Sequence, residues 1–302
     1  MPNNLLEQAD LYFGLTELQL KDSKIDLGNG ILLHSAYAKF LSTPMLVNTD
    51  DITASLNKAR PAYWQLKGGK PSEVTAELVI PANAAPSFDE RFKLAKLIVF
   101  LIRLWTNPAI GLHVFSNYPL SSLTNLMDEV KPTIVPVEIH ERYFHLGLVD
   151  NTKIVTSLTW IQENWKSALN LYKTSSEFRL AADALDSGQF IQNTALTLVL
   201  IWGALEAIFS ASSGELKFRA SSLIASYLEP PGVSRIEMQK HVAALYDKRS
   251  AAAHGKPRHE NDDLVQTFEL LRKVIIRLIH EGAVPSKSDL EQYLFGAIKK
   301  EG

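Results

Sequence analysis

The second half of the chain has the hydrophobic periodicity of a helical protein. Apolar residues recur there every three or four positions, which is the spacing of one face of an α-helix. We expect helices at residues 152–173, 175–188, 190–210, 215–229, 234–254 and 261–282. Short connections between long amphipathic helices are typical of an antiparallel bundle. The segment 190–210 is apolar nearly all round, so we expect it at the bundle centre.

Start and stop residues support these boundaries. Ser175 can cap the helix that follows it, and Gly188 can end that helix. Asn261 is placed to cap the last helix, whose first turn is acidic.

The first half of the chain has a mixed pattern. Residues 75–82 alternate between apolar and polar positions, and residues 111–116 and 133–140 are further strand candidates, the second of them broken by Pro136. Between them, residues 87–105 have helical spacing, with Ser87 as a capping residue. The sequence therefore predicts an α+β fold. A mixed α/β domain of unassigned role, with a sensor as one option, occupies residues 1–150, and an all-α antiparallel helical bundle occupies residues 151–302.

Composition narrows the function classes. The chain has 302 residues, no cysteine and a formal net charge of −2. The absence of cysteine excludes disulfides and thiolate catalysis. The net charge excludes an overall basic nucleic-acid binder, so a nucleic-acid site has to be a local basic patch. Charged residues interrupt the longest apolar runs and no secretory signal is present, so we expect a soluble cytoplasmic protein without a membrane partner.

A local basic patch is present in the segment LYDKRSAAAHGK, residues 245–256. Arg249 can hold phosphate with its planar fork of donors, and His254 can transfer a proton near neutral pH. Residues five positions apart on a straight helix point about 140° away from each other. Arg249 and His254 therefore share a site only if the helix ends near His254, and Gly255 predicts that end.

The spacing of arginine and histidine is not specific by itself. A chain of this composition is expected to contain about one such pair by chance. A second pair, Arg235 and His241, does occur, without the preceding tyrosine and the following glycine. We predict that this second pair lies on a solvated helix surface.

Two segments together resemble the HEPN superfamily of helical bundles, and within it the ApeA-like branch. They are WGALEAIFS at residues 202–210 and LYDKRSAAAHG at residues 245–255. Arg219 also falls where this branch often has an arginine. The resemblance covers roughly residues 155–282. It implies a homodimer whose motifs face each other, and a metal-independent RNA endonuclease of a defence or toxin system, such as antiviral defence.

The resemblance also implies roles for individual residues. His254 is expected to act as general acid or base in the attack of a ribose 2′-hydroxyl on the adjacent phosphate. Arg249 is expected to hold that phosphate, and Glu206 to orient Arg249 or His254. RNA contacts are expected from the nearby or matching residues Lys248, Ser250, Lys256, Arg258 and Arg219. The need for a 2′-hydroxyl makes RNA the substrate class, and no cofactor is implied.

One departure from the family pattern keeps an alternative open. Active members often carry an amide, an acid or an imidazole directly after the arginine, where this chain has Ser250. Arg249 and Glu206 can instead form a structural ion pair, with His254 at the favourable C-terminal end of the helix. The alternative is a non-catalytic dimerisation module, or an RNA- or partner-binding module, in which the small residues 250–253 allow close approach of a second helix.

Other suggestive residues have ordinary explanations. His140 and His145 do not have metal-ligand spacing on a helix, so we expect no metal site. We expect the GGKPS segment at residues 68–72 to be a turn, and His34 and His113 to be partly buried. Trp160, Trp165 and Trp202, all at helical positions, are expected in the core.

Overall fold

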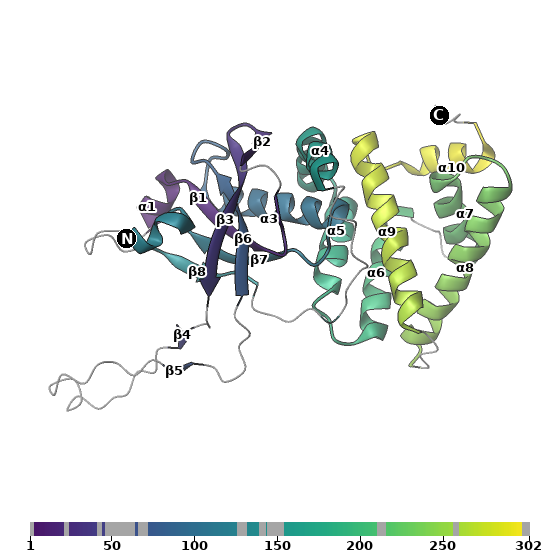
Figure 1. Cartoon of the computed structure of the whole chain (residues 1–302). Coiled ribbons are helices and arrows are strands. Elements are labelled where there is room, and N and C mark those ends of the chain that lie inside the picture. The colour runs from purple at the N-terminus through teal and green to yellow at the C-terminus, as the bar shows by residue number, and fades with distance from the viewer. Residues whose placement is uncertain are drawn as a thin grey trace. The chain divides into compact units, whose positions relative to one another are not determined.

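The computed structural model confirms an α+β fold, with an antiparallel sheet followed by a run of helices (Figure 1). It describes residues 3–20, 24–40, 44–45, 64–65, 72–125, 132–138, 143, 154–209, 216–255 and 260–297. The chain divides into two compact units. The first comprises Met1–Val99, Ala109–Ile139 and Asp150–Leu158, and the second comprises Phe100–Pro108, His140–Val149 and Thr159–Gly302.

The first unit is built on a six-stranded sheet in the order β2-β3-β6-β1-β7-β8, with every neighbouring pair antiparallel. Its strands are β1 (Leu11–Thr16), β2 (Lys24–Gly28), β3 (Ile31–Phe40), β6 (Ser72–Ile80), β7 (Gly111–Ser116) and β8 (Ile134–Pro136). The unit also contains α1 (Asn3–Gln8), the 3-10 helix η1 (Leu120–Asn125) and the short pair β4 (Pro44–Met45) and β5 (Trp64–Gln65). The three expected strands are present as β6, β7 and β8. Strand β8 ends at Pro136, the position where the sequence predicts a break, and residues 139 and 140 of this candidate lie outside the described residues.

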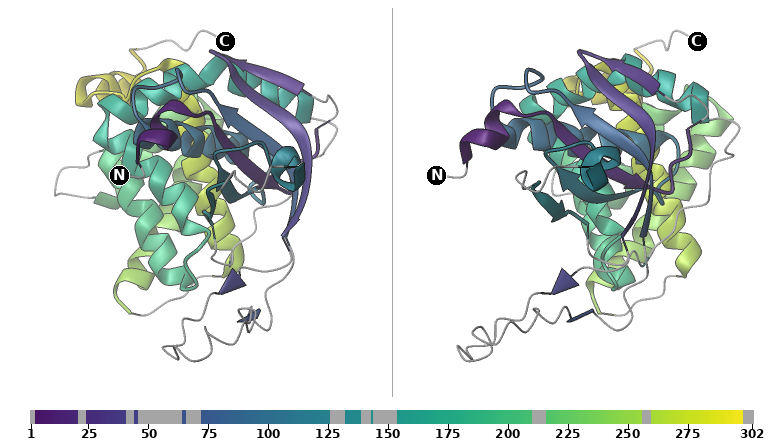
Figure 2. Two further views of the ribbon diagram at one scale, coloured as in Figure 1. Left: turned by 90° about the vertical axis from the view of Figure 1, so that its left-hand side faces the viewer. Right: turned by 60° about the vertical axis from the view of Figure 1, so that its left-hand side comes forward.

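Different side chains cover the two faces of this sheet. On one face, Phe13 and Phe115 pack against Phe88 and Phe92 of α3 (Phe88–Trp105), with ring centroids 5.3 Å apart for Phe13 and Phe92. On the other face, Gly14 lies under the side chains of Val74, Val114 and Leu120. Successive residues of a strand point to opposite faces, so Phe13 and Gly14 define the two layers. Strand β3 is curved along its length (Figure 2), and its register with β6 shifts between Ser35 and Ala38.

A buried carboxylate ties three elements of the first unit together. Glu77 of β6 is fully buried, accepts a hydrogen bond from the Leu120 backbone N–H at 2.7 Å, and lies 2.8 Å from His34 Nε2 of β3. Burial raises the pKa of Glu77, although both hydrogen bonds oppose that rise. His34 and His113 are partly buried, as predicted. Neither the partner of Glu77 nor its burial could be read from the alternation of residues 75–82.

The second unit is a helical bundle. Its helices are α4 (Ile154–Thr174, with its first residues in the first unit), α5 (Ser176–Gly188), α6 (Thr194–Phe209), α7 (Leu216–Leu228), α8 (Val233–Ala253), α9 (Asn261–Glu281) and α10 (Lys287–Phe295). All six expected helices are present, and α10 was not anticipated. Helix α6 packs against α5, α7, α8 and α9, which confirms its central place. Trp160, Trp165 and Trp202 are buried, as predicted.

The capping predictions had mixed outcomes. The Ser175 side chain accepts a hydrogen bond from the Phe178 backbone N–H at 3.1 Å, which confirms it as the N-cap of α5. The prediction for Asn261 was wrong, because Glu260 is the N-cap of α9 and Asn261 is already helical. The Glu260 backbone N–H donates to Asp263 at 2.9 Å, so an acidic residue inside the first turn satisfies this helix start.

Candidate functional site

Helix α8 ends where the sequence predicts. Its last residue is Ala253, and Gly255 has a φ of 68°, in the left-handed region that favours glycine. The backbone N–H of His254 donates to Ser250 and that of Gly255 to Ala252, both at 3.2 Å. His254 therefore lies directly beyond the helix, and its side chain is exposed.

Arg249 is held against α6 by a carboxylate. Its Nη2 lies 3.1 Å from Oε2 of Glu206, and the two side chains are 23% and 29% exposed. This ion pair is expected under both interpretations of the sequence: the catalytic one, in which Glu206 orients Arg249, and the structural one, in which the pair only stabilises the bundle. A pair exposed to this extent is only partly screened by water.

Two aromatic residues complete this group of side chains. The Tyr246 ring lies edge-on to the fully buried Trp202, with centroids 5.0 Å apart, and the Arg249 guanidinium lies 5.6 Å from the Tyr246 ring centroid. Burial raises the pKa of the Tyr246 hydroxyl, and the Glu206 carboxylate raises it further by its charge and by a hydrogen bond. Residues four apart on α6 and three apart on α8 share a helix face, so both helices bring two members each. We call Trp202, Glu206, Tyr246 and Arg249 the α6–α8 cluster.

The α6–α8 cluster has hydrogen-bond donors without acceptors. Within the described part of the chain, Trp202 Nε1 and Arg249 Nε are buried and have no hydrogen-bond partner. A guanidinium has five N–H donors in a fixed plane, and Glu206 engages only the Nη2 end of this one. These two donors are enclosed by protein, whereas the Arg249 side chain as a whole is 23% exposed.

The structure does not join His254 to this cluster. Among the described residues, no hydrogen bond or ion pair connects its ring to Arg249 or Glu206, or to the last carbonyls of α8. Only Arg249 and Glu206, of the three residues expected to act in catalysis, are brought together.

The basic residues expected around the site have different surroundings. Lys248 Nζ lies 3.1 Å from Oδ2 of Asp263 on α9, so each of the described cations Lys248 and Arg249 has a carboxylate partner. Ser250 is partly buried. Lys256 and Arg258 lie outside the described residues. The described part of this helix end is therefore close to electrically balanced.

Arg219 lines a separate groove. It is exposed on α7 and faces a hollow formed with the end of α6 and with α10. No described hydrogen bond or ion pair joins it to Arg249 or Glu206. Sequence reasoning missed this groove, because one of its walls is α10.

Arg235 and His241 have different surroundings. The prediction of a solvated surface was wrong for Arg235, whose Nε donates to the Glu229 carbonyl at 3.0 Å and whose Nη1 donates to the Tyr293 carbonyl at 3.1 Å. Burial lowers the pKa of Arg235. This arginine therefore joins the end of α7 to α10, whereas His241 is exposed.

The described residues show neither a candidate metal site nor a membrane-spanning helix. The described residues contain no group of three histidine or acidic side chains that could hold a metal ion, while His140, His145 and residues 68–71 lie outside them. No helix in the described segments is long and apolar enough to cross a membrane.

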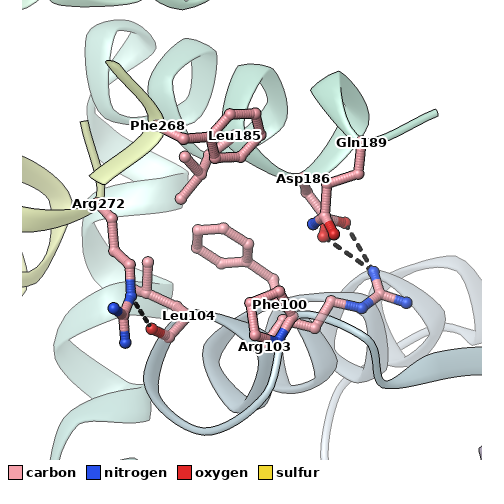
Figure 3. Close-up of a pocket in the computed structure, with 9 residues that line it drawn as sticks. Phe100, Arg103, Leu104, Leu185, Asp186, Gln189, Phe268 and Arg272 are labelled. Atoms are coloured by element: carbon pink, nitrogen blue, oxygen red, sulfur yellow. Dashed lines mark hydrogen bonds and ion pairs between the residues drawn. The ribbon is translucent and has the colours of Figure 1, made fainter. Parts of the chain in front are cut away.

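A small hollow in the second unit is enclosed by an ion pair and apolar side chains (Figure 3). Arg103 donates to Asp186 at 2.9 Å, Arg272 donates to the Leu104 carbonyl at 2.5 Å, and Gln189 has a buried Oε1 without a described partner. The volume is about 10 Å³, which is the size of one water molecule. This hollow is therefore a feature of the core and not a substrate site.

The chain was compared with protein-family models, with curated proteins and with solved structures. None of the three comparisons gave a match.

Proposed function

We propose that the chain is a HEPN-type, metal-independent RNA endonuclease of the ApeA-like kind, acting in cytoplasmic defence. The observation that carries this proposal is the Arg249 side chain, which is 23% exposed and which Glu206 holds through Nη2 alone among the described residues. A cation fixed in this way, with donors to spare, suits an RNA phosphate oxygen. His254 is exposed at the same helix end, and the proposal places its side chain against the same ligand.

In the proposed reaction, Arg249 binds the phosphate and stabilises the charge that develops on it. His254 removes the proton from the ribose 2′-hydroxyl, whose oxygen then forms a bond with phosphorus. The bond from phosphorus to the 5′-oxygen breaks, and that oxygen takes up a proton. The products are a cyclic phosphate and a 5′-hydroxyl, so the step needs no metal ion. Arg219 is not part of the proposal, because it lines a separate groove.

The proposed active form is a homodimer that joins through the helical bundle. Helix α8 offers small residues at its end and leaves Val233 and Ile236 exposed at its start. An exposed face of this kind supports packing against a second copy.

The test is cleavage of total RNA by the purified chain in the presence of EDTA. We expect the wild type and His241→Ala to cleave, because His241 is an exposed histidine of the same helix outside the proposed site. We expect Arg249→Ala and His254→Ala to be inactive while keeping the helical circular-dichroism spectrum. Equal cleavage by the wild type and His254→Ala excludes His254 as the acid or base.

The ion pairs of this helix end favour a second candidate, a non-catalytic dimerisation or partner-binding module. Glu206 and Asp263 balance the charges of Arg249 and Lys248, which weakens the attraction for phosphate. Phosphate-driven binding is strongest at low salt. A dimer in light scattering that does not bind RNA even at low salt would support this candidate against the endonuclease.

A further inference from the structure

A histidine and two tryptophans of the second unit meet where α4 contacts α9. The Trp160 indole N–H of α4 donates to Nε2 of His280 on α9 at 2.7 Å. The Trp105 ring, at the end of α3, stacks on the Trp160 ring with centroids 4.2 Å apart and 6° between the ring planes. Both indole rings lie edge-on to the imidazole, with centroid distances of 5.8 Å for Trp160 and 6.3 Å for Trp105. We call the bond between Trp160 and His280 the indole–imidazole link.

The direction of this hydrogen bond fixes the protonation state of the imidazole. An indole nitrogen can only donate, so Nε2 of His280 has to accept with its lone pair. The single proton of the neutral ring is therefore on Nδ1. A second proton can be added only at Nε2, where it removes the acceptor of the Trp160 N–H.

The two partners of the link differ in their access to water. Trp160 is 7% exposed, whereas His280 is exposed. The imidazole can therefore take up a proton from solvent and turn into water, but the indole cannot follow it. Proton uptake leaves a donor of the packed interior without its acceptor, and this loss costs more than the loss of a hydrogen bond on the surface.

The end of α9 gives the charged imidazole a second favourable position. His280 belongs to the last turn of α9, and Gly282 ends this helix in the left-handed conformation. The carbonyl end of a helix favours a cation, so a charged His280 that has left Trp160 is stabilised there. This gain is smaller than the cost of the unpaired indole donor, so the neutral, bonded form is the more stable state of the fold.

The charged groups around the link are engaged elsewhere or exposed. On α9, Arg277 and Glu281 pair with each other at 2.6 Å. Arg103, near the end of α3, pairs with a carboxylate of α5 at 2.9 Å. On α4, the charged residue within one turn of the tryptophan is Glu163, which is exposed. Among the described residues, the imidazole of His280 forms its hydrogen bond with the indole alone, so proton uptake is coupled to this bond.

We propose that the indole–imidazole link is a proton-sensitive contact of the helical bundle. When the pH falls, His280 takes up a proton, the bond from Trp160 breaks, and α4 loses this hold on α9. The neighbouring bond from the Ser167 hydroxyl to the Ile279 carbonyl, at 2.7 Å, contains no titratable group and remains. The stability that the link contributes is therefore present at high pH and is lost as the pH falls. The link lies on α4 and α9, so it is separate from the proposed RNA site on α6 and α8.

The first test follows the indole N–H of Trp160 in a nitrogen–proton correlation spectrum of the full chain. Trp160→Phe identifies this signal by removing it. The sample is titrated from about pH 8 to about pH 5, the range in which imidazoles ordinarily change charge. We expect the signal to move in the wild type and to stay in place in His280→Gln, because the glutamine carbonyl accepts a hydrogen bond and does not titrate.

The second test asks whether the proton weakens the bundle. Between about pH 8 and about pH 5, the unfolding equilibrium constant in urea should rise about fivefold more for the wild type than for His280→Gln, the factor that one hydrogen bond contributes. His241→Gln, which removes an exposed histidine of α8, should follow the wild type.

Three results would overturn the proposal. An indole signal of Trp160 that stays in place between the two pH values shows that the bond does not respond to protons. An equal movement in His280→Gln shows that another group causes the response. A signal that moves while the wild type and His280→Gln unfold with the same pH dependence shows that the link does not hold α4 to α9.

Discussion

Breaking the Arg249–Glu206 ion pair should destabilise the helical unit by a defined amount. At the separation of 3.1 Å, two unit charges attract by about 5 kcal/mol when the effective dielectric constant is about 20. Loss of hydration and of side-chain freedom offsets most of this attraction. Because the side chains are 23% and 29% exposed, we expect a net coupling of about 1 kcal/mol, at the upper end of the range for surface pairs.

A double-mutant cycle measures this coupling directly. The variants are Arg249→Met, Glu206→Gln and the double variant, unfolded with urea and followed by tryptophan fluorescence. Four of the five tryptophans belong to the second unit, so the signal reports mainly on the bundle. The double variant should lose about 1 kcal/mol less unfolding free energy than the sum of the single variants.

A second pair provides the control for this cycle. Lys217 and Asp247 are 2.6 Å apart but 48% and 60% exposed, so their coupling should stay below about 0.5 kcal/mol. Equal coupling in the two cycles would refute the argument from burial. If RNA phosphate binds Arg249, Glu206→Gln should also tighten RNA binding, because it removes a competing carboxylate, and slow cleavage, because the guanidinium is no longer oriented.

Three further predictions concern the fold. Gly14→Ala should destabilise the first unit by about 1–3 kcal/mol in thermal unfolding, because a Cβ added at this position would lie 2.7 Å from the Val114 side chain. Gly203→Ala is the control, because a Cβ there would meet open space, and it should be neutral or stabilising. Burial lowers the pKa of His113, so its contribution to stability is present above its ordinary value of 6.5 and is lost as the pH falls through its lowered pKa; pH-dependent urea unfolding should lose this component in His113→Gln. Ser175→Ala should cost about 1 kcal/mol through loss of the N-cap of α5, whereas Ser176→Ala should change the unfolding midpoint little.

Local periodicity accounts for the success with the helices of the second unit. A helix closes its hydrogen bonds within four residues, so residues 152–282 carry the information for α4 to α9 in their own spacing. The end of α8 was equally predictable, because Gly255 permits the left-handed conformation found there. The pairing of Glu206 with Arg249 was also predictable, because the helical spacing places both residues on helices of one bundle.

Long-range partners account for what the sequence did not reveal. The sheet order depends on pairings such as His34 with Glu77, 43 residues apart, and β1 and β3 lack an unbroken alternation. Arg235 was misjudged because its acceptors are the backbone carbonyls of Glu229 and Tyr293, and any residue type supplies a carbonyl. The groove that Arg219 lines was missed because one of its walls, α10, is too short to show a clear period.

The burial pattern of α8 bears on the choice between the two proposed functions. This helix has 21 residues, and its buried positions are Val242, Leu245, Tyr246 and Ala252. A helix in a bundle gains most of its stability from its packed apolar face, so the packing inside this unit constrains few positions of α8. The small residues Ser250, Ala251 and Ala253, none of which is buried, and the exposed Ile236 are not explained by that packing. Under either proposed function, a second copy or RNA on the exposed face of α8 would supply the missing constraint. The two functions then differ only in whether His254 meets a phosphate, and the His254→Ala cleavage assay decides between them.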